Sequence, residues 1–168
     1  MGYMASGKSV IGSLLAKNLG YNFLDLDSFI EEREGKPISN IFNSSGEIYF
    51  RKLEAKCLNE VLSTRVNLVL SLGGGTPCYS NNIGLITGNK NVVSFFLKAS
   101  IATIVKRLEN ETINRPLVSR FNKKDELLEF IGKHLFERNQ FYNKADYTII
   151  TDNASIEDVI EDIIVKLF

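Results

Sequence analysis

Eight residues near the start of the chain have the types and the spacing of a phosphate-binding loop. Residues 2–9 read Gly-Tyr-Met-Ala-Ser-Gly-Lys-Ser, which matches the pattern G-x-x-x-x-G-K-[ST] at every fixed position. Its glycines let the backbone turn N–H groups toward an anion. Lys8 would place positive charge on the β- and γ-phosphates of a nucleotide, and the Ser9 hydroxyl would ligate Mg²⁺. An ordinary glycine turn that opens a helix is the alternative interpretation.

Two carboxylates follow in the apolar segment at 23–27, which reads Phe-Leu-Asp-Leu-Asp. On a strand, Asp25 and Asp27 would share one face and point toward the loop. Phosphoryl transfer needs one carboxylate near Mg²⁺ and another near the attacking hydroxyl. A solvated strand end is the alternative, and the phosphate loop beside the pair weighs against it.

An arginine on the helical pattern at 46–62 has acidic residues at helical spacing. Glu47, Arg51 and Glu54 are four and three residues apart, so they stand on one face of a helix. One interpretation is a surface ion pair, which would contribute only about 0.2–0.5 kcal/mol. The other is that Glu54 holds Arg51 so that its planar fork can bind a carboxylate. The spacing alone leaves both open.

Three consecutive glycines, Gly73, Gly74 and Gly75, end another apolar run. Glycine weakens a strand by roughly 0.5–1 kcal/mol, so a run of three indicates that a ligand approaches the backbone closely. A plain flexible turn is the alternative interpretation.

Further cations lie in the second half of the chain. The polar stretch at 109–125 has the composition of a loop and contains Arg115. A kinase closes a lid to exclude water, and Arg115 would then stabilise charge in the transition state. Arg138 is an isolated cation that is predicted to follow a helix near 127–136. The single histidine, His134, is expected to be structural, because no Cys, His or carboxylate constellation accompanies it.

Composition limits the classes of function. With 168 residues, 44% of them hydrophobic, the chain is expected to form a single domain over 1–168. Its 20 basic and 20 acidic residues cancel, so an anionic substrate must be bound by local Arg and Lys. Two cysteines, Cys57 and Cys78, fit a reduced cytosolic protein, and no apolar run is long enough to cross a bilayer. We expect a cytoplasmic monomer that binds neither nucleic acid nor membrane.

Apolar periodicity predicts strands that alternate with helices. The predicted helices cover 9–19, 28–34, 46–62, 101–108, 127–136 and 156–167, and the predicted strands cover 23–27, 66–72, 92–97 and 147–151. This alternation predicts an α/β fold with a parallel sheet that is covered on both faces. In such sheets ligands bind outside the carboxyl ends of the strands. Both the aspartates and the glycine run fall at such ends.

Taken together, these motifs resemble those of the shikimate kinase family over nearly the whole chain. A phosphate loop alone is shared by many unrelated nucleotide-binding proteins, whereas the ordered set is far more specific. In chain order the matching residues are the Gly-Lys-Ser loop, the Phe-Leu-Asp-Leu-Asp segment, Ile30-Glu31, Ile41-Phe42, Gly46-Glu47, Phe50-Arg51 with Glu54, the three glycines, Arg115-Pro116-Leu117, and Arg138 with Tyr142.

The resemblance implies a three-layer αβα P-loop kinase fold whose parallel sheet has the strand order 2-3-1-4-5. It also implies a substrate-binding region at about 28–62 and a lid at about 109–125. In the family, strand 1 lies at the centre of the sheet and precedes the phosphate loop. In this sequence only Met1 precedes the loop. Its loss would leave buried backbone groups unpaired, at about 1–3 kcal/mol each. We therefore expect an upstream segment that supplies this strand.

The resemblance also implies a reaction, in which the γ-phosphoryl group of ATP passes to the 3-hydroxyl of shikimate on the way to the aromatic amino acids. The implied catalytic residues are Lys8, Asp27 and Arg115, with Asp27 orienting or deprotonating the hydroxyl. Mg²⁺ would be held by Ser9 and by Asp25. Shikimate would contact Asp27, Arg51, Gly73, Gly74, Gly75 and Arg138. ATP would contact Gly2, Met4, Ala5, Ser6, Gly7, Lys8, Ser9, Val10, Arg107, Arg115 and Asn153.

One departure and two alternatives accompany this resemblance. The family often has glycine where Ala5 stands, and we expect alanine to be tolerated there if its φ is negative. The first alternative function is a related kinase with another small acceptor, which a panel of acceptors would distinguish. The second is a domain that binds nucleotide without catalysis, which binding without phosphoryl transfer would favour.

Overall fold

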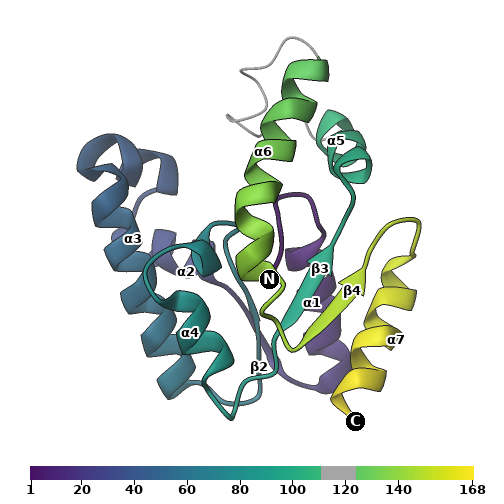
Figure 1. The fold of residues 1–168 in the computed structure, drawn as a ribbon. Coiled ribbons are helices and arrows are strands. Elements are labelled where there is room, and N and C mark those ends of the chain that lie inside the picture. The colour runs from purple at the N-terminus through teal and green to yellow at the C-terminus, as the bar shows by residue number, and fades with distance from the viewer. Residues whose placement is uncertain (111–123) are drawn as a thin grey trace.

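The structure is a computed structural model that describes residues 1–110 and 124–168. Helices and strands alternate along the described chain, as the sequence predicts (Figure 1). In order, the elements are α1 (Lys8–Leu19), β1 (Asn22–Asp25), α2 (Leu26–Glu34), α3 (Ile38–Thr64), β2 (Leu68–Ser71), the 3₁₀-helix η1 (Thr76–Cys78), α4 (Asn82–Thr87), β3 (Phe95–Lys98), α5 (Ile101–Asn110), α6 (Lys124–Tyr142), β4 (Tyr147–Ile150) and α7 (Ile156–Leu167).

The strands within the described residues form two parallel pairs. β1 lies beside β2, with Asp25 opposite Ser71, and β3 lies beside β4. Met1 adds a short stretch of pairing to β3: its ammonium group donates to the Phe95 carbonyl at 2.6 Å, and its carbonyl accepts from the Leu97 N–H at 2.9 Å. Phe95 and Leu97 alternate with the residues whose carbonyls face β4, so their own backbone groups point to the opposite edge of β3. Met1 therefore lies on the edge of β3 that faces away from β4. The predicted parallel α/β class is confirmed.

Helices cover both faces of the strands. Val69 of β2 packs with α1 and α7 in one cluster, whereas its neighbour Leu70 packs with α2 and α3 in another. Phe96 and Leu97 of β3 likewise belong to two different clusters. Successive side chains of a strand point to opposite faces, so this division marks a sheet between two helical layers. Figure 1 shows α3 and α4 on one side of the strands and α7 on the other.

The first strand ends earlier than the sequence predicts. β1 stops at Asp25, whose Oδ1 accepts the Asp27 N–H at 3.1 Å and so caps α2. A carboxylate before the first turn satisfies an N–H group that would otherwise have no helical partner. Asp27 therefore lies in the first turn of α2, and the prediction that both aspartates share one strand face is wrong.

Two helical predictions are also corrected. The predicted helix at 46–62 is the second part of α3, because Gly46 has a φ of 79° and separates two helical segments. Arg138 lies inside α6, whereas the sequence placed it after a helix ending near 136. That helix continues to Tyr142 because Tyr142 is fully buried in the core with α5 and β3.

Two predictions about composition can be compared directly with the structure. Cys57 and Cys78 are both free thiols, as expected. Among the described helices, none combines the length and the apolar character that a membrane crossing requires.

Candidate active site

The phosphate-binding loop ends at the first turn of α1. Gly7, directly before α1, has a φ of 94°, and within the described residues neither a side-chain cap nor a first-turn acidic residue occupies this helix end. An anion at this end of α1 would meet no competing carboxylate from the first turn, and the helix dipole favours it there. The Lys8 ammonium donates to the Tyr3 carbonyl at 2.8 Å and so spans the loop.

Ala5 lies in the left-handed backbone region, with a φ of 58°. The expectation that alanine is tolerated at this position required a negative φ, and that condition is not met. The Ala5 carbonyl accepts a hydrogen bond from Arg107 Nη1 at 3.1 Å, and Nη2 of the same guanidinium donates to the Thr151 carbonyl at 2.8 Å. Arg107 therefore ties the loop to the residue after β4, a role that the sequence did not reveal.

The predicted Mg²⁺ ligands meet at the same end of α1. Ser9 Oγ donates to Asp25 Oδ2 at 2.8 Å. Hydroxyl and carboxylate oxygens suit Mg²⁺, which keeps several other positions for water and phosphate. In the part of the chain that the structure describes, no group of three or more His, Cys, Asp or Glu residues could hold a metal by itself. By ligand type, the Ser9 and Asp25 oxygens fit Mg²⁺.

One cavity of about 410 Å³ joins the loop to the carboxyl ends of β1 and β2. Two residues that were predicted to contact ATP do not line this cavity. Gly2 packs against the Leu97 carbonyl, and Asn153 precedes the lining residue Ala154. The lining residues are Met4, Ala5, Ser6, Gly7, Lys8, Ser9, Val10, Ile11, Asp25, Asp27, Leu72, Gly73, Gly74, Arg107, Thr151, Ala154, Ser155, Ile156 and Val159.

Asp27 has a shifted acidity in this cavity. Burial, followed by the nearby charges of Asp25 and Glu54, raises the pKa of its carboxyl to about 6, while Lys8 acts in the opposite direction. A carboxyl with a pKa near neutrality can accept a proton from a hydroxyl and release it again. The geometry thus suits Asp27 as a base beside the loop.

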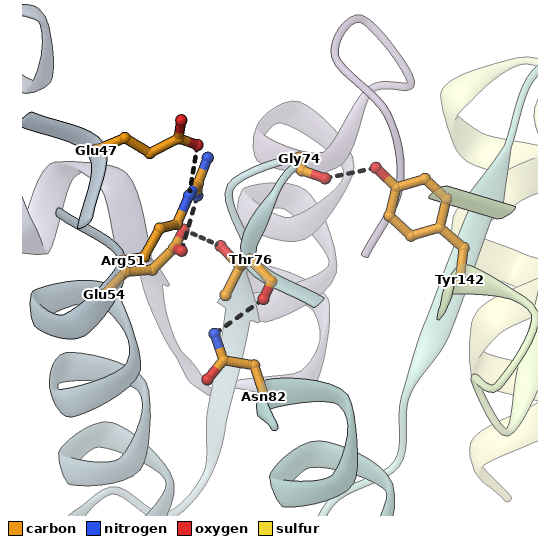
Figure 2. Close-up of polar contacts among 7 residues, drawn as sticks. All are labelled: Glu47, Arg51, Glu54, Gly74, Thr76, Asn82 and Tyr142. Carbon is orange, nitrogen blue, oxygen red and sulfur yellow. Dashed lines mark hydrogen bonds and ion pairs between the residues drawn. The ribbon is translucent and has the colours of Figure 1, made fainter. Parts of the chain in front are cut away.

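Arg51 is held by a buried carboxylate (Figure 2). Its Nη1 donates to Glu54 Oε2 at 2.8 Å, and its Nε donates to Glu47 Oε1 at 3.4 Å. Glu54 is only 1% exposed, so the surface-pair interpretation is wrong. The guanidinium carbon also lies 3.8 Å from the centroid of the Tyr79 ring, and a stacked, paired guanidinium is oriented for one further anion.

The glycine run makes room for side chains of the protein itself. A Cβ atom on Gly73 would lie 2.5 Å from Asp27 Oδ1, and one on Gly75 would lie 3.0 Å from two nitrogens of Arg51. A Cβ atom on Gly74 would lie 3.5 Å from its nearest neighbouring atom. The Gly74 carbonyl accepts a 2.5 Å hydrogen bond from the Tyr142 hydroxyl (Figure 2). The sequence indicated ligand approach here, and no signal in it predicted these internal contacts.

The remaining predicted residues come from α6 and the lid. Arg138 on α6 faces the loop, with its guanidinium carbon 5.5 Å from the centroid of the Tyr3 ring. The Tyr3 hydroxyl lies 3.2 Å from His134 Nδ1, so His134 has the structural contact that the sequence analysis expected. Arg115 and most of the predicted lid at 109–125 lie outside the described residues.

Comparison with known proteins agrees with this geometry. The family model for shikimate kinase matches residues 4–168. The chain belongs to the shikimate kinase family. A relative from Flavobacterium psychrophilum, the protein "Shikimate kinase", is 45% identical over 168 residues, which are 100% of this chain and 96% of the relative. The predicted family is thereby confirmed.

Solved structures of the family have the same fold. Shikimate kinase from Bacteroides thetaiotaomicron matches with a TM-score of 0.90 at 34% identity, over 99% of this chain and 95% of that chain. Shikimate kinase from Acinetobacter baumannii, solved in complex with shikimate, matches with a TM-score of 0.85 at 31% identity, over 99% of this chain and 89% of that chain.

Proposed function

We propose that the protein transfers the γ-phosphoryl group of ATP to the 3-hydroxyl of shikimate, giving ADP and shikimate 3-phosphate. The observation that carries this proposal is one cavity that contains both the phosphate loop and Asp27, beside the glycine run and Arg51. An acceptor with a hydroxyl and a carboxylate would use Asp27 and Arg51 at once. The name of the relatives and the shikimate-bound structure from Acinetobacter baumannii support the choice of acceptor.

The chemistry divides among the residues as follows. The acceptor oxygen bonds to the γ-phosphorus, the bond from that phosphorus to its bridging oxygen breaks, and the hydroxyl proton passes to Asp27. Lys8 and the N–H groups at the start of α1 stabilise charge on the phosphates. Mg²⁺, held by Ser9 and Asp25, would supply further positive charge to the phosphate oxygens.

The acceptor side has its own set of residues. Arg51 and Arg138 would bind the substrate carboxylate, and the backbone of Gly73, Gly74 and Gly75 would close around the ring hydroxyls. Arg115 would complete the site with the lid. The proposal includes a monomeric cytoplasmic enzyme, and the free thiols support the reducing compartment.

The test is release of ADP from ATP with and without shikimate. Asp27→Ala should lower kcat by about 10²–10⁴-fold because it removes the base. Arg51→Ala should raise the KM for shikimate by about 10–100-fold because it removes a charged hydrogen-bond donor. Glu129→Gln, in an exposed ion pair of α6, is the control and should act like the wild type. Preference for a nucleotide acceptor, or no response to shikimate, would contradict the proposal.

A further inference from the structure

A buried threonine lies behind the ion pair of Arg51. Thr76, the first residue of η1, is fully buried, and its hydroxyl donates to Glu54 Oε1 at 2.7 Å. The other oxygen of the same carboxylate accepts from Arg51. Figure 2 shows that Glu54 of α3 is connected both to Thr76 of η1 and to Arg51 of α3. Glu54 therefore divides its two oxygens between one neutral and one charged donor.

The backbone of Thr76 is fixed on both sides. Its N–H donates to the Gly73 carbonyl at 3.1 Å. Its carbonyl accepts from Asn82 Nδ2 at 2.9 Å, and Asn82, the first residue of α4, is fully buried (Figure 2). A hydroxyl on a backbone that is held in this way has little freedom, so it fixes the Glu54 oxygen that it contacts.

A buried carboxylate depends on such a donor. Removing the partner of a buried polar atom costs more than the net value of the hydrogen bond, because the atom keeps its desolvation penalty. Without the Thr76 hydroxyl, Oε1 of Glu54 would lose that bond, and the carboxylate would rotate toward Arg51 or toward water. Either movement would displace the guanidinium, which packs between Gly75 and the Tyr79 ring.

We propose that Thr76 is a positioning residue, which through Glu54 sets the orientation in which Arg51 binds the acceptor carboxylate. The identity of that acceptor as shikimate rests on the proposed function, whereas the chain of contacts from Thr76 to Arg51 does not. Thr76 does not touch the reacting groups. It acts on substrate affinity.

Steady-state kinetics on two variants test this role. Thr76→Val removes the donor and nearly keeps the shape, so the KM for shikimate should rise about tenfold while kcat and the KM for ATP stay at wild-type values. Thr76→Ser keeps the hydroxyl and should restore most of the affinity. Thr87→Val is the matched control, because the Thr87 hydroxyl bonds only within α4, to the Ile83 carbonyl, and it should leave all three constants unchanged.

Three kinetic results would overturn the proposal. The first is an unchanged KM for shikimate in Thr76→Val. The second is a KM for shikimate that rises as much in Thr76→Ser as in Thr76→Val. The third is an equal rise in the KM values for ATP and shikimate in Thr76→Val. Each would mean that the hydroxyl does not act through the carboxylate-binding arginine.

A second measurement does not depend on substrate. Urea unfolding of Thr76→Val, Arg51→Met and the double variant should give non-additive changes in the free energy of unfolding, because residues in one network couple. The non-additivity should vanish when all four proteins of the cycle, including the reference, carry Glu54→Gln. Additive changes without Glu54→Gln would refute the proposal. If the wild type does not phosphorylate shikimate but the variants still show the coupling, only the proposed function is refuted.

Discussion

The proposed role of Asp27 as a base requires an ionised carboxyl, and the surroundings of Asp27 shift the pH at which it ionises. Burial and the charges of Asp25 and Glu54 raise its pKa to about 6, so near neutral pH most copies hold no proton but can gain one readily. A raised folded-state pKa favours the protonated form. The contribution of this group to stability is therefore full below the unfolded value near 4 and is lost as pH rises through 6.

The first prediction concerns this titration in the metal-free protein. Carboxyl ¹³C shifts should give Asp27 a pKa near 6. Glu54→Gln should lower it, because the change removes a neighbouring negative charge. Glu129→Gln, far along α6, should leave the Asp27 titration where it is. A midpoint near 4 in the wild type would show that burial does not act on this carboxyl as described.

The second prediction concerns the backbone of Ala5. An L-residue other than glycine costs about 1–2 kcal/mol in the left-handed region, and Ala5 has a φ of 58°. Ala5→Gly should raise the free energy of unfolding by about 0.5–1 kcal/mol after the greater chain entropy of glycine is subtracted. Ala16→Gly, at a buried helical position of α1, should lower it, and urea unfolding measures both. If Ala5→Gly and Ala16→Gly changed the free energy of unfolding in the same direction, that result would contradict backbone strain at Ala5.

At the scale of elements, the glycine run between β2 and η1 links structure to catalysis. Gly73 leaves space for Asp27 and for the Thr76 hydroxyl, and Gly75 leaves space for Arg51, so a methyl group on either glycine would push a side chain rather than the backbone. The ends of side chains move at little cost to folding. Substitutions here should therefore separate activity from stability.

The third prediction follows from that separation. Gly73→Ala should lower kcat/KM for shikimate by about 10–100-fold through the displacement of Asp27, and Gly75→Ala should mainly raise the KM for shikimate. Gly74→Ala should have the smallest effect, because a Cβ there would meet its nearest atom at an ordinary 3.5 Å. Kinetics and thermal unfolding on the three variants check this order. A collapse of stability in Gly73→Ala would contradict the prediction.

Elements with strong local signals were predicted well. The predicted helices at 9–19 and 156–167 agree with α1 and α7, because Gly20 in the left-handed region ends α1 and the Ser155–Asp158 capping box sets the start of α7. The predicted strand at 23–27 failed because alternating apolar residues do not reveal that Asp25 caps a helix. The helical segment before Gly46 was not predicted, so the predicted helix at 46–62 covers only the second part of α3.

At the scale of the whole molecule, carboxylates hold together the segments around β3 and β4. The Asp146 side chain, just before β4, accepts from both the N–H and the hydroxyl of Ser94. Asp152, after β4, accepts from Ser100 in the same way. The Ser94 hydrogen bonds lower the pKa of Asp146, so its contribution to stability is present above the unfolded value near 4 and is lost as pH falls through the folded value.

The fourth prediction tests this acid dependence. The free energy of unfolding of the wild type should fall as pH drops below about 4. In Asp146→Asn that fall should be shallower, and at pH 7 the variant should be less stable by less than about 1 kcal/mol, because Asp146 is exposed. Asp162→Asn, on the exposed side of α7, is the control. An identical acid profile for Asp146→Asn and the wild type would contradict the assignment.

The sequence predicted which motifs would meet, because the carboxyl ends of parallel strands lie at one edge. It did not predict what supports them. Arg107 on the Ala5 carbonyl, Tyr142 on the Gly74 carbonyl and Thr76 on Glu54 are contacts between segments far apart in the chain. No local pattern encodes such pairs, since their partners are a backbone carbonyl or a residue on another element.

The residues proposed for the acceptor and those proposed for the nucleotide come from different stretches of the chain. Asp27, Arg51 and the glycine run all fall between β1 and η1, whereas the proposed nucleotide side combines the loop at 2–9 with Arg107 and the start of α7. Recombination between related genes could therefore transplant an acceptor pocket as one continuous segment and leave the nucleotide pocket to the recipient. Arg138 on α6 would still come from the recipient, so its fit to the incoming segment would decide whether the chimera works.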